Sequence, residues 1–239
     1  MDGMDIHSSD VKKMAADLGA DLCGIAPVGR FRDAPKGYNP RDVLPECRSV
    51  IVVAVSSLSS TMSANSTLPY TLVRNQLSDR LDGMALELAE RLESQGAGAV
   101  PIGANEPCVL DRGSRKLRGV ISLKHAAVFA GMGKMGKNTL LINDRHGNML
   151  WLGAVLTSAE LEGDPVATYE ICTGGCRLCL DACPVKALDG ISINQRACGH
   201  YAFGDEKALF RHYGGWRIKC NLCRKACPNC LGIKQKAIH

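Results

Sequence analysis

The chain has 239 residues, of which 46% are hydrophobic, 22% charged and 5% aromatic, so wholesale disorder is excluded. The low aromatic content argues against a stacking platform for single-stranded nucleic acid, and a net charge of +5 is too small to indicate nucleic-acid binding by itself. Cysteine is the unusual component, because nine of the twelve lie between Cys172 and Cys230.

Helix and strand patterns alternate at the start of the chain. Helical spacing of apolar residues, short apolar runs and turn-forming residues separate the segments. Before residue 70 they predict, in chain order, a helix over 8–18 closed by Gly19, a strand over 21–28, a surface loop over 29–47, a buried strand over 49–55 and a second loop over 57–69.

The longest helical pattern runs from Leu72 to Gln95, with apolar residues three and four positions apart. After it we expect a strand over 99–102, a helix over 120–130 and strands over 139–142 and 150–157. The last two strands are expected to pair across residues 143–148. This mixture predicts a layered α/β or α+β domain over residues 1–163. A second domain is predicted over 164–239, where cysteine, glycine and proline dominate.

Two cysteine runs occupy this second region. The first has the form C-x3-C-x2-C-x3-C-P, and the second has the form C-x2-C-x3-C-P with a further cysteine upstream. The pattern is typical of bacterial ferredoxins with two [4Fe–4S] clusters, in which the last cysteine of each run ligates the other cluster. It predicts two crossed ligand sets: Cys172, Cys176, Cys179 and Cys227 for one cluster, and Cys198, Cys220, Cys223 and Cys183 for the other.

Other uses of these cysteines remain open. Two all-cysteine zinc sites would also take eight thiolates, and Cys230 is an alternative to Cys227 as a ligand. A disulfide scaffold is less favoured, because the chain has neither a signal-peptide pattern nor an apolar run long enough to span a membrane. We therefore expect a cytoplasmic protein, whose thiols stay reduced.

A glycine-rich segment, residues 131–139, lies between the predicted helix over 120–130 and the next strand. It matches G-x-G-x-x-G and nearly matches G-x4-G-K-[ST]. Both fingerprints require a preceding strand, so nucleotide readings are disfavoured. The glycines favour a turn at which the backbone approaches a ligand or another element closely, and a purely structural tight connection is the alternative.

The order of these motifs resembles the epoxyqueuosine reductases, which are relatives of reductive dehalogenases. The resemblance covers nearly the whole chain and is carried by residues 18–27, 45–53, 136–141 and 152–157, by the two cysteine runs, and by Cys198 and Tyr201. It implies a nitroreductase-like α/β domain that binds cobalamin, followed by a ferredoxin-like domain with two [4Fe–4S] clusters. It also implies that the glycine segment contacts the corrinoid through Gly131, Met132, Gly133, Gly136, Lys137, Asn138, Thr139 and Leu140.

Two candidate catalytic residues follow from the same resemblance. Tyr70 is placed to line the corrinoid cavity, with a core tyrosine as the alternative reading. The tRNA-modifying members carry an acidic residue shortly before the glycine segment, but residues 116–125 contain none, which leaves Asp111 as the nearest acid upstream. His125 is expected to pack or face solvent rather than bind cobalt. The tRNA enzymes usually continue into a helical-repeat domain, whereas this sequence ends nine residues after Cys230.

Three functions remain in competition at this stage, and a cluster protein without a corrinoid is a fourth reading. The first is an iron–sulfur, cobalamin-dependent reductase that acts on an unidentified small molecule, with a flavodoxin or ferredoxin as its electron donor. The second is an electron-transfer module that reduces cobalamin or a corrinoid protein. The third is tRNA epoxyqueuosine reduction, for which the basic residues between Arg217 and Lys236 are a weak footprint. We read these charges as a solvated face, so nucleic acid is not expected as a partner.

Overall fold

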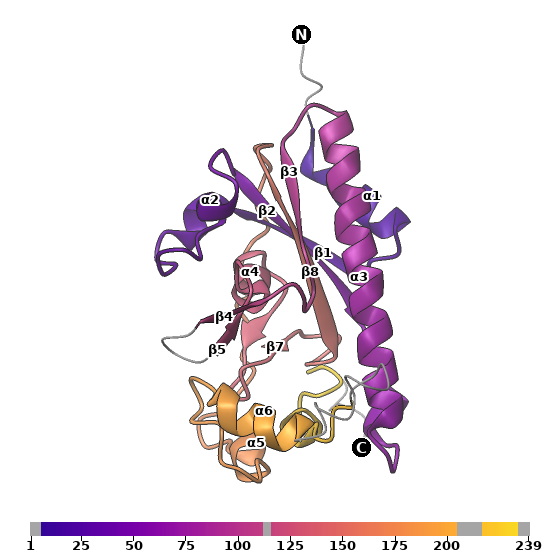
Figure 1. Cartoon of the computed structure of the whole chain (residues 1–239), viewed down its shortest axis with the longest axis vertical. Helices are drawn as coiled ribbons and strands as arrows, with labels where there is room; N and C mark the ends of the chain where they lie inside the picture. The colour runs from indigo at the N-terminus through magenta and orange to yellow at the C-terminus, as the bar shows by residue number, and fades with distance from the viewer. Residues whose placement is uncertain (1–5, 112–115, 205–216, 234–239) are drawn as a thin grey trace.

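A computed structural model describes residues 6–111, 116–204 and 217–233 (Figure 1). At its centre lies a four-stranded antiparallel sheet in the order β1-β2-β8-β3. Its strands are β1 (Leu22–Pro27), β2 (Ser49–Ser56), β8 (Leu150–Thr157) and β3 (Ala99–Ile102). All four lie within two residues of the predicted bounds.

Helices cover both faces of this sheet. The long helix α3 (Leu68–Ser94) and α1 (Ser8–Asp17) pack on one face, and α4 (Leu123–Phe129) packs on the other (Figure 1). Since successive strand residues point to opposite faces, β2 sends Ile51 and Val53 to the first side and Val50 and Val52 to the second. The continuous apolar sequences of β2 and β8 are therefore explained by burial on both sides.

Several predicted bounds need correction. The stretch 29–47 is not simply a loop, since it contains the 3-10 helix η1 (Val28–Phe31) and α2 (Pro40–Val43) and buries Phe31 and Cys47. The stretch 57–69 contains the 3-10 helix η2 (Ser59–Met62), and α3 begins before residue 72, with a proline in its first turn. Proline suits the first turn because N–H groups there have no carbonyl partner within the helix, so the N–H that proline lacks costs no hydrogen bond.

The predicted hairpin between residues 139–142 and 150–157 is wrong. The short strand β7 (Leu141–Ile142) pairs with β6 (Lys134–Met135), whereas β8 pairs with β2 and β3. Asn143 and Gly147 close a tight loop by two backbone hydrogen bonds, and the Asn143 side chain donates to Met132 O at 2.8 Å. A further hairpin, β4 (Val109–Asp111) with β5 (Lys116–Arg118), was not expected.

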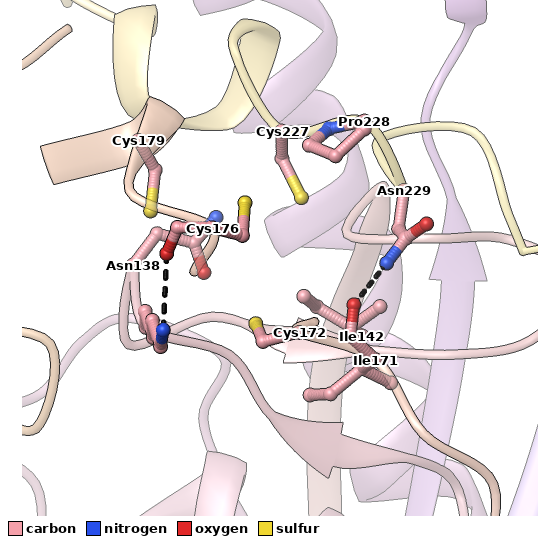
Figure 2. A pocket seen from close by; sticks show the side chains of 10 residues that line it. Asn138, Ile142, Ile171, Cys172, Cys176, Cys179, Cys227, Pro228 and Asn229 are labelled. Atoms are coloured by element: carbon pink, nitrogen blue, oxygen red, sulfur yellow. Dashed lines mark hydrogen bonds between the residues drawn. The ribbon is translucent and has the colours of Figure 1, made fainter. Parts of the chain in front are cut away.

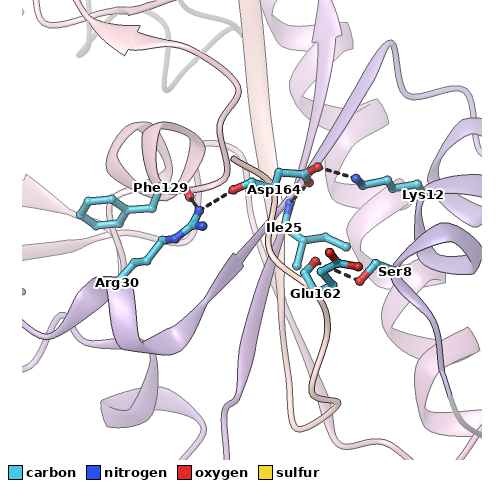
Figure 3. A network of polar contacts seen from close by, with 7 residues as sticks. All are labelled: Ser8, Lys12, Ile25, Arg30, Phe129, Glu162 and Asp164. Atoms are coloured by element: carbon cyan, nitrogen blue, oxygen red, sulfur yellow. Dashed lines mark hydrogen bonds and ion pairs between the residues drawn. The ribbon is translucent and has the colours of Figure 1, made fainter. Parts of the chain in front are cut away.

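Residues 158–165 form a strap that leads from β8 toward the cysteine runs, and Asp164 anchors it (Figure 3). Ile25 N donates to Asp164 Oδ2 at 2.8 Å, and Asp164 N donates to Ile25 O at 2.9 Å. Lys12 forms an ion pair with the same carboxylate, and Arg30 donates to the carbonyls of Asp164 and Phe129. These bonds cover the free edge of β1 and fix the point from which the chain leaves the sheet.

The cysteine-bearing segment, residues 166–204 and 217–233, lies at one end of the sheet (Figure 1). It contains only short helices: α5 (Leu178–Asp181), α6 (Gln195–Phe203) and α8 (Leu222–Lys225). Its own buried cluster is small and includes two cysteines among Cys179, Leu180, Cys183, Ala187 and Leu188. In the described part of the chain, no helix combines the length and apolar character needed to cross a membrane.

Candidate functional site

The first cysteine group forms one pocket. Cys172, Cys176, Cys179 and Cys227 all line it, together with Lys137 and Asn138 of the glycine segment. Figure 2 shows the four sulfurs around a common space. Helix α5 carries Cys179, and Cys227 follows α8 of the second run. The pocket therefore joins three cysteines of one run to the last cysteine of the other, which is the crossed grouping that the sequence pattern predicts.

The second group consists of Cys183, Cys198, Cys220 and Cys223. Burial raises the pKa of Cys198, and the nearby thiolates of Cys220 and Cys183 raise it further. Burial likewise raises the pKa of Cys223 to about 11, and Cys198, Cys220 and Cys183 add to this effect. The last cysteine of the first run thus lies within electrostatic range of the second run. The grouping is the predicted one, while ligation itself stays a prediction.

Burial raises the pKa of one thiol or more in each group, as for Cys198 and Cys223 in the second, and so favours the protonated form there. In the first group, burial raises the pKa of Cys179, and the thiolates of Cys227, Cys172 and Cys176 raise it further. A metal centre would have to displace these protons, which couples its binding to pH. Among the residues that the structure describes, no set of three or more His, Cys, Asp or Glu side chains is arranged to hold a single metal ion.

Cys230 does not line the pocket. Its Sγ donates to Asn148 Oδ1 at 3.4 Å and lies 3.8 Å from Met149 Sδ. Burial raises the pKa of Cys230 to about 11, and the side chain belongs to the main hydrophobic core. The alternative in which Cys230 replaces Cys227 therefore gains no support from the geometry.

The glycines at 131 and 133 are required by backbone contacts inside the protein, whereas a Cβ on Gly136 would meet only the side chains of Ile142 and Asn138. A Cβ on Gly131 would lie 2.1 Å from Pro165 O, and one on Gly133 would lie 2.5 Å from Ile142 O. Gly131 also has a φ of +73°, in the region that favours glycine. Because the preceding element is helix α4 and not a strand, neither phosphate fingerprint has its required context. Close approach of the chain to itself explains Gly131 and Gly133.

The second half of the glycine segment touches both cysteine groups. Asn138 is only 2% exposed and donates to Cys223 O at 3.3 Å, while its Oδ1 accepts from Leu140 N at 3.2 Å. Lys137 Nζ donates to Cys176 O at 3.0 Å. The segment is thus a polar seam between the two groups.

Three more predicted contact residues flank this seam. Met132 is buried in the core layer under α4, and Thr139 is buried with a φ of +59°. Lys124 Nζ donates to Thr139 O at 2.7 Å, which holds the turn against α4. Leu140 is half-buried. A corrinoid contact by any of these residues stays a prediction.

The two candidate catalytic residues lie on different elements, Tyr70 on α3 and Asp111 on β4. Tyr70, near the start of α3, is 6% exposed and stacks edge-on against Trp151 at 6.0 Å between ring centroids. This position agrees with the alternative reading of a core tyrosine. Asp111 ends β4, and its Oδ2 lies 3.6 Å from Arg118 Nε.

His125 and Arg224 add two observations to the site. Ser122 Oγ lies 2.7 Å from His125 Nδ1, and partial desolvation followed by the charge of Lys124 lowers the pKa of this histidine, whose side chain is exposed. Arg224, expected on a solvated face, is instead 8% exposed with its guanidinium 4.4 Å from the centroid of Trp151. The sequence did contain one indication of this burial, since Arg224 lies inside the second cysteine run.

Comparison with known proteins identifies relatives over most of the chain. The epoxyqueuosine reductase of Gloeobacter violaceus is 31% identical over 221 residues, covering 86% of this chain and 63% of that protein. The corresponding protein of Synechocystis sp. is 28% identical over 208 residues, covering 81% of this chain and 66% of that protein. The chain thus spans slightly less than two thirds of the length of these relatives. A search of family models finds no match.

Solved structures share the fold. The epoxyqueuosine reductase of Streptococcus thermophilus superposes with a TM-score of 0.63 at 24% identity, covering 95% of this chain and 66% of that one. An epoxyqueuosine reductase solved with an epoxyqueuosine-modified tRNA-Tyr stem loop gives 0.59 at 22% identity, covering 97% and 66%. A catabolic reductive dehalogenase gives 0.63 at 18% identity, covering 91% and 31%. The chain thus belongs among the epoxyqueuosine reductase-like proteins, the group that its motifs predict, and has the fold of the reductive dehalogenases.

Proposed function

We propose that this protein holds two [4Fe–4S] clusters with crossed ligand sets and passes electrons through them to a bound corrinoid in a reductive reaction. The observation that carries the proposal is the grouping of eight cysteines into two sets of four, each completed by the last cysteine of the other run. Zinc is the alternative occupant, and the ferredoxin-type C-x3-C-P endings favour clusters.

The residues present fit such clusters. Cys172, Cys176, Cys179 and Cys227 would hold the first, and Cys183, Cys198, Cys220 and Cys223 would hold the second. Each cluster supplies one-electron transfer when bound. The protein contributes thiolates, burial, and polar groups near the sulfurs, which together set the potential. In this reading, residues 164–239 form the ferredoxin-like domain and 1–163 the nitroreductase-like one, in a cytoplasm that keeps the thiols reduced.

The corrinoid part of the proposal rests on relatives and on the polar seam. One reductive dehalogenase of the same fold is described in terms of B12-dependent dehalogenation. In this chain, Asn138 and Lys137 contact backbone carbonyls of both cysteine groups, so a corrinoid beside the glycine segment would also lie beside the clusters. When bound, a corrinoid supplies the redox-active cobalt. The chain's own groups would orient it through backbone and amide hydrogen bonds.

Paired cysteine substitutions test the crossed ligand sets. We expect Cys183→Ala or Cys220→Ala to remove about four irons per chain, since each belongs to one [4Fe–4S] cluster. The double variant of these two should lose no more iron than either single one. Cys183→Ala combined with Cys176→Ala should lose about eight, because these residues serve different clusters. Cys108→Ala, at an exposed cysteine outside both groups, is the control and should lose none.

The opposite pattern would overturn the assignment. If each run held its own cluster, Cys183→Ala with Cys176→Ala would cost only about four irons. Zinc in place of iron in anaerobically prepared protein would replace the cluster reading altogether.

A second candidate function is reduction of epoxyqueuosine in tRNA. The curated relatives carry that name, and one solved relative holds a modified tRNA stem loop. This finding weakens our expectation that nucleic acid is not a partner. If tRNA is the substrate, an epoxyqueuosine-modified anticodon stem loop should bind with an affinity that falls steeply as salt rises and should be converted under reducing conditions. Binding without conversion would mean that the substrate is another molecule.

A third candidate is an electron-transfer module that activates cobalamin or a corrinoid protein. The first turn of α4 contains no acidic residue, and the transfer of single electrons to cobalt requires no proton donor. The donor to the clusters would be a flavodoxin or ferredoxin. This role predicts reduction of added cobalamin without consumption of any further substrate.

A further inference from the structure

Arg224 is a buried cation without a matching partner in the described structure. Its side chain is 8% exposed, and its Nη1 atom is buried with no hydrogen-bond partner among the described residues. None of the ion pairs between described residues involves Arg224. A buried, unpaired polar group requires an explanation, because desolvation of a guanidinium costs several kcal/mol.

Local packing holds this guanidinium in place. Its central carbon lies 4.4 Å from the ring centroid of Trp151, and Trp151 in turn stacks against Tyr70. The Arg224 carbonyl accepts from Asn148 Nδ2 at 3.2 Å, which joins the backbone of α8 to the turn that precedes β8. A cation–π contact is weak, so it offsets only part of the desolvation cost.

The second cysteine group provides the cysteine nearest to this cation in the chain. Arg224 directly follows Cys223, and both residues lie in the four-residue helix α8. A cluster held by four thiolates carries negative charge, so occupation of the second group would place that charge next to the helix turn that carries the buried guanidinium.

We propose that Arg224 compensates the charge of the cluster held by Cys183, Cys198, Cys220 and Cys223 and raises its reduction potential relative to the other cluster. This inference rests on the proposed function. When this cluster takes one electron from a low-potential one-electron donor, it gains one unit of negative charge and no bond forms or breaks. A fixed cation beside it stabilises the reduced form more than the oxidised form, and net charge is one of the factors that set such potentials.

The test compares neutral and charged variants of the anaerobically purified, cluster-loaded chain. Midpoint potentials are measured by dithionite titration with electron paramagnetic resonance detection for wild type, Arg224→Met, Arg224→Gln and Arg224→Lys. Lys225→Gln is the matched control, since Lys225 is the next residue and is exposed. The signal of the second group is identified as the one that is lost in Cys183→Ala.

Both neutral variants should shift that one potential to more negative values. We expect about a tenfold fall in its reduced-to-oxidised ratio at a fixed potential, which corresponds to about 59 mV for a one-electron couple. Arg224→Lys should restore most of the shift, and Lys225→Gln should leave both potentials unchanged. Loss of only the second cluster in the neutral variants, with retention in Arg224→Lys, would also support charge compensation.

Other results would overturn the inference. Equal movement of both potentials, no movement of either, or an Arg224→Lys variant as impaired as the neutral ones would assign Arg224 a packing role. Absence of iron–sulfur clusters from the wild-type chain would instead overturn the proposed function, and the inference with it. Iron and sulfide counts on each preparation separate these two failures.

Discussion

The sheet region and the cysteine-bearing segment are stabilised in different ways. In the sheet region, β2 and β8 bury apolar side chains on both faces, and Ile51, Val53 and Val155 are at most 1% exposed. In the cysteine-bearing segment the helices are short, and the segment's own buried cluster has five members, two of which are cysteines. The sheet region therefore has an apolar core of its own, whereas the cysteine-bearing segment places cysteine side chains around a pocket.

This difference indicates where a cofactor contributes to folding. Full burial of one Val, Leu or Ile contributes about 1.5–3 kcal/mol, so the sheet region has ample apolar burial. The cysteine-bearing segment lacks such burial, and metal–thiolate bonds are a known source of folding free energy in such segments. We therefore expect the sheet region to fold without metal and the segment to depend on it.

Removal of iron gives the largest expected effect. After chelation under reducing, anaerobic conditions, amide exchange in α5 and α8 should accelerate by more than about tenfold, equivalent to about 1.4 kcal/mol of local stability. Amides of β2 and β8 should stay protected. Hydrogen–deuterium exchange with mass spectrometry measures both regions in one sample. Unchanged exchange in α5 and α8 would break the comparison.

Substitution at the junction of the two regions has the next largest effect. Gly131→Ala would bring a Cβ against Pro165 O in a left-handed backbone conformation, whereas Gly96 has a similar φ of +88° with nothing within 4 Å of a Cβ. Gly96→Ala should cost about 1–2 kcal/mol from backbone strain alone. Gly131→Ala should cost a further ~1–3 kcal/mol from the clash.

Denaturant unfolding of the two glycine variants measures this difference. Equal destabilisation would mean that the strap at Pro165 moves freely away from Gly131, and the junction would then be looser than described.

Asn138→Ala tests the polar seam. The change removes the acceptor for Leu140 N and the donor to Cys223 O in a buried setting, so a loss of about 1–3 kcal/mol is expected. Asn65→Ala, at an exposed asparagine, is the control. Thermal unfolding of the loaded protein gives the comparison. A loss no greater than that of the control would show that the seam does not join the two regions energetically.

The smallest expected effect is a pH dependence within the sheet region. Burial acts to raise the pKa of Asp21, but hydrogen bonds from the Ser56 hydroxyl and backbone N–H lower it below its usual value of 3.8. Because the folded-state pKa is lowered, the ionised carboxylate stabilises the protein at pH values above its unfolded-state pKa. This contribution is lost as pH falls through the folded-state pKa. The stability difference between wild type and Asp21→Asn should therefore shrink between pH 6 and pH 3 in urea unfolding. A constant or growing difference contradicts this.

Local sequence patterns predicted most of the sheet region. The apolar runs of β2 and β8 and the spacing of α3 are strong signals, and Gly19 does take a positive φ of +89° after α1. Pairing was harder, because residues 141–142 and 150–157 are close in sequence and invite a hairpin. In the structure β7 pairs with β6 instead, and the Asn143 side chain donates a hydrogen bond to Met132 O next to this pair. Apolar periodicity does not reveal such a contact.

In the candidate site, the cysteines were predictable and their surroundings were not. Spacing alone predicts the grouping of Cys227 with the first run, since three corners of a cluster come from one loop and the fourth comes from elsewhere. The burial of Arg224 against Trp151 depends on a contact between residues far apart in sequence. The same holds for Tyr70, whose place in the core follows from the tertiary packing of α3 on β8.

Metal content per chain tests the central claim most directly. The protein is purified anaerobically, reconstituted with iron and sulfide, incubated with hydroxocobalamin and desalted before iron, zinc and cobalt are counted. The account predicts about eight irons, from two four-iron clusters, and about one cobalt per chain. Eight irons without cobalt would retain the clusters and remove the corrinoid. Zinc in place of iron, or no metal in either cysteine group, would contradict the account.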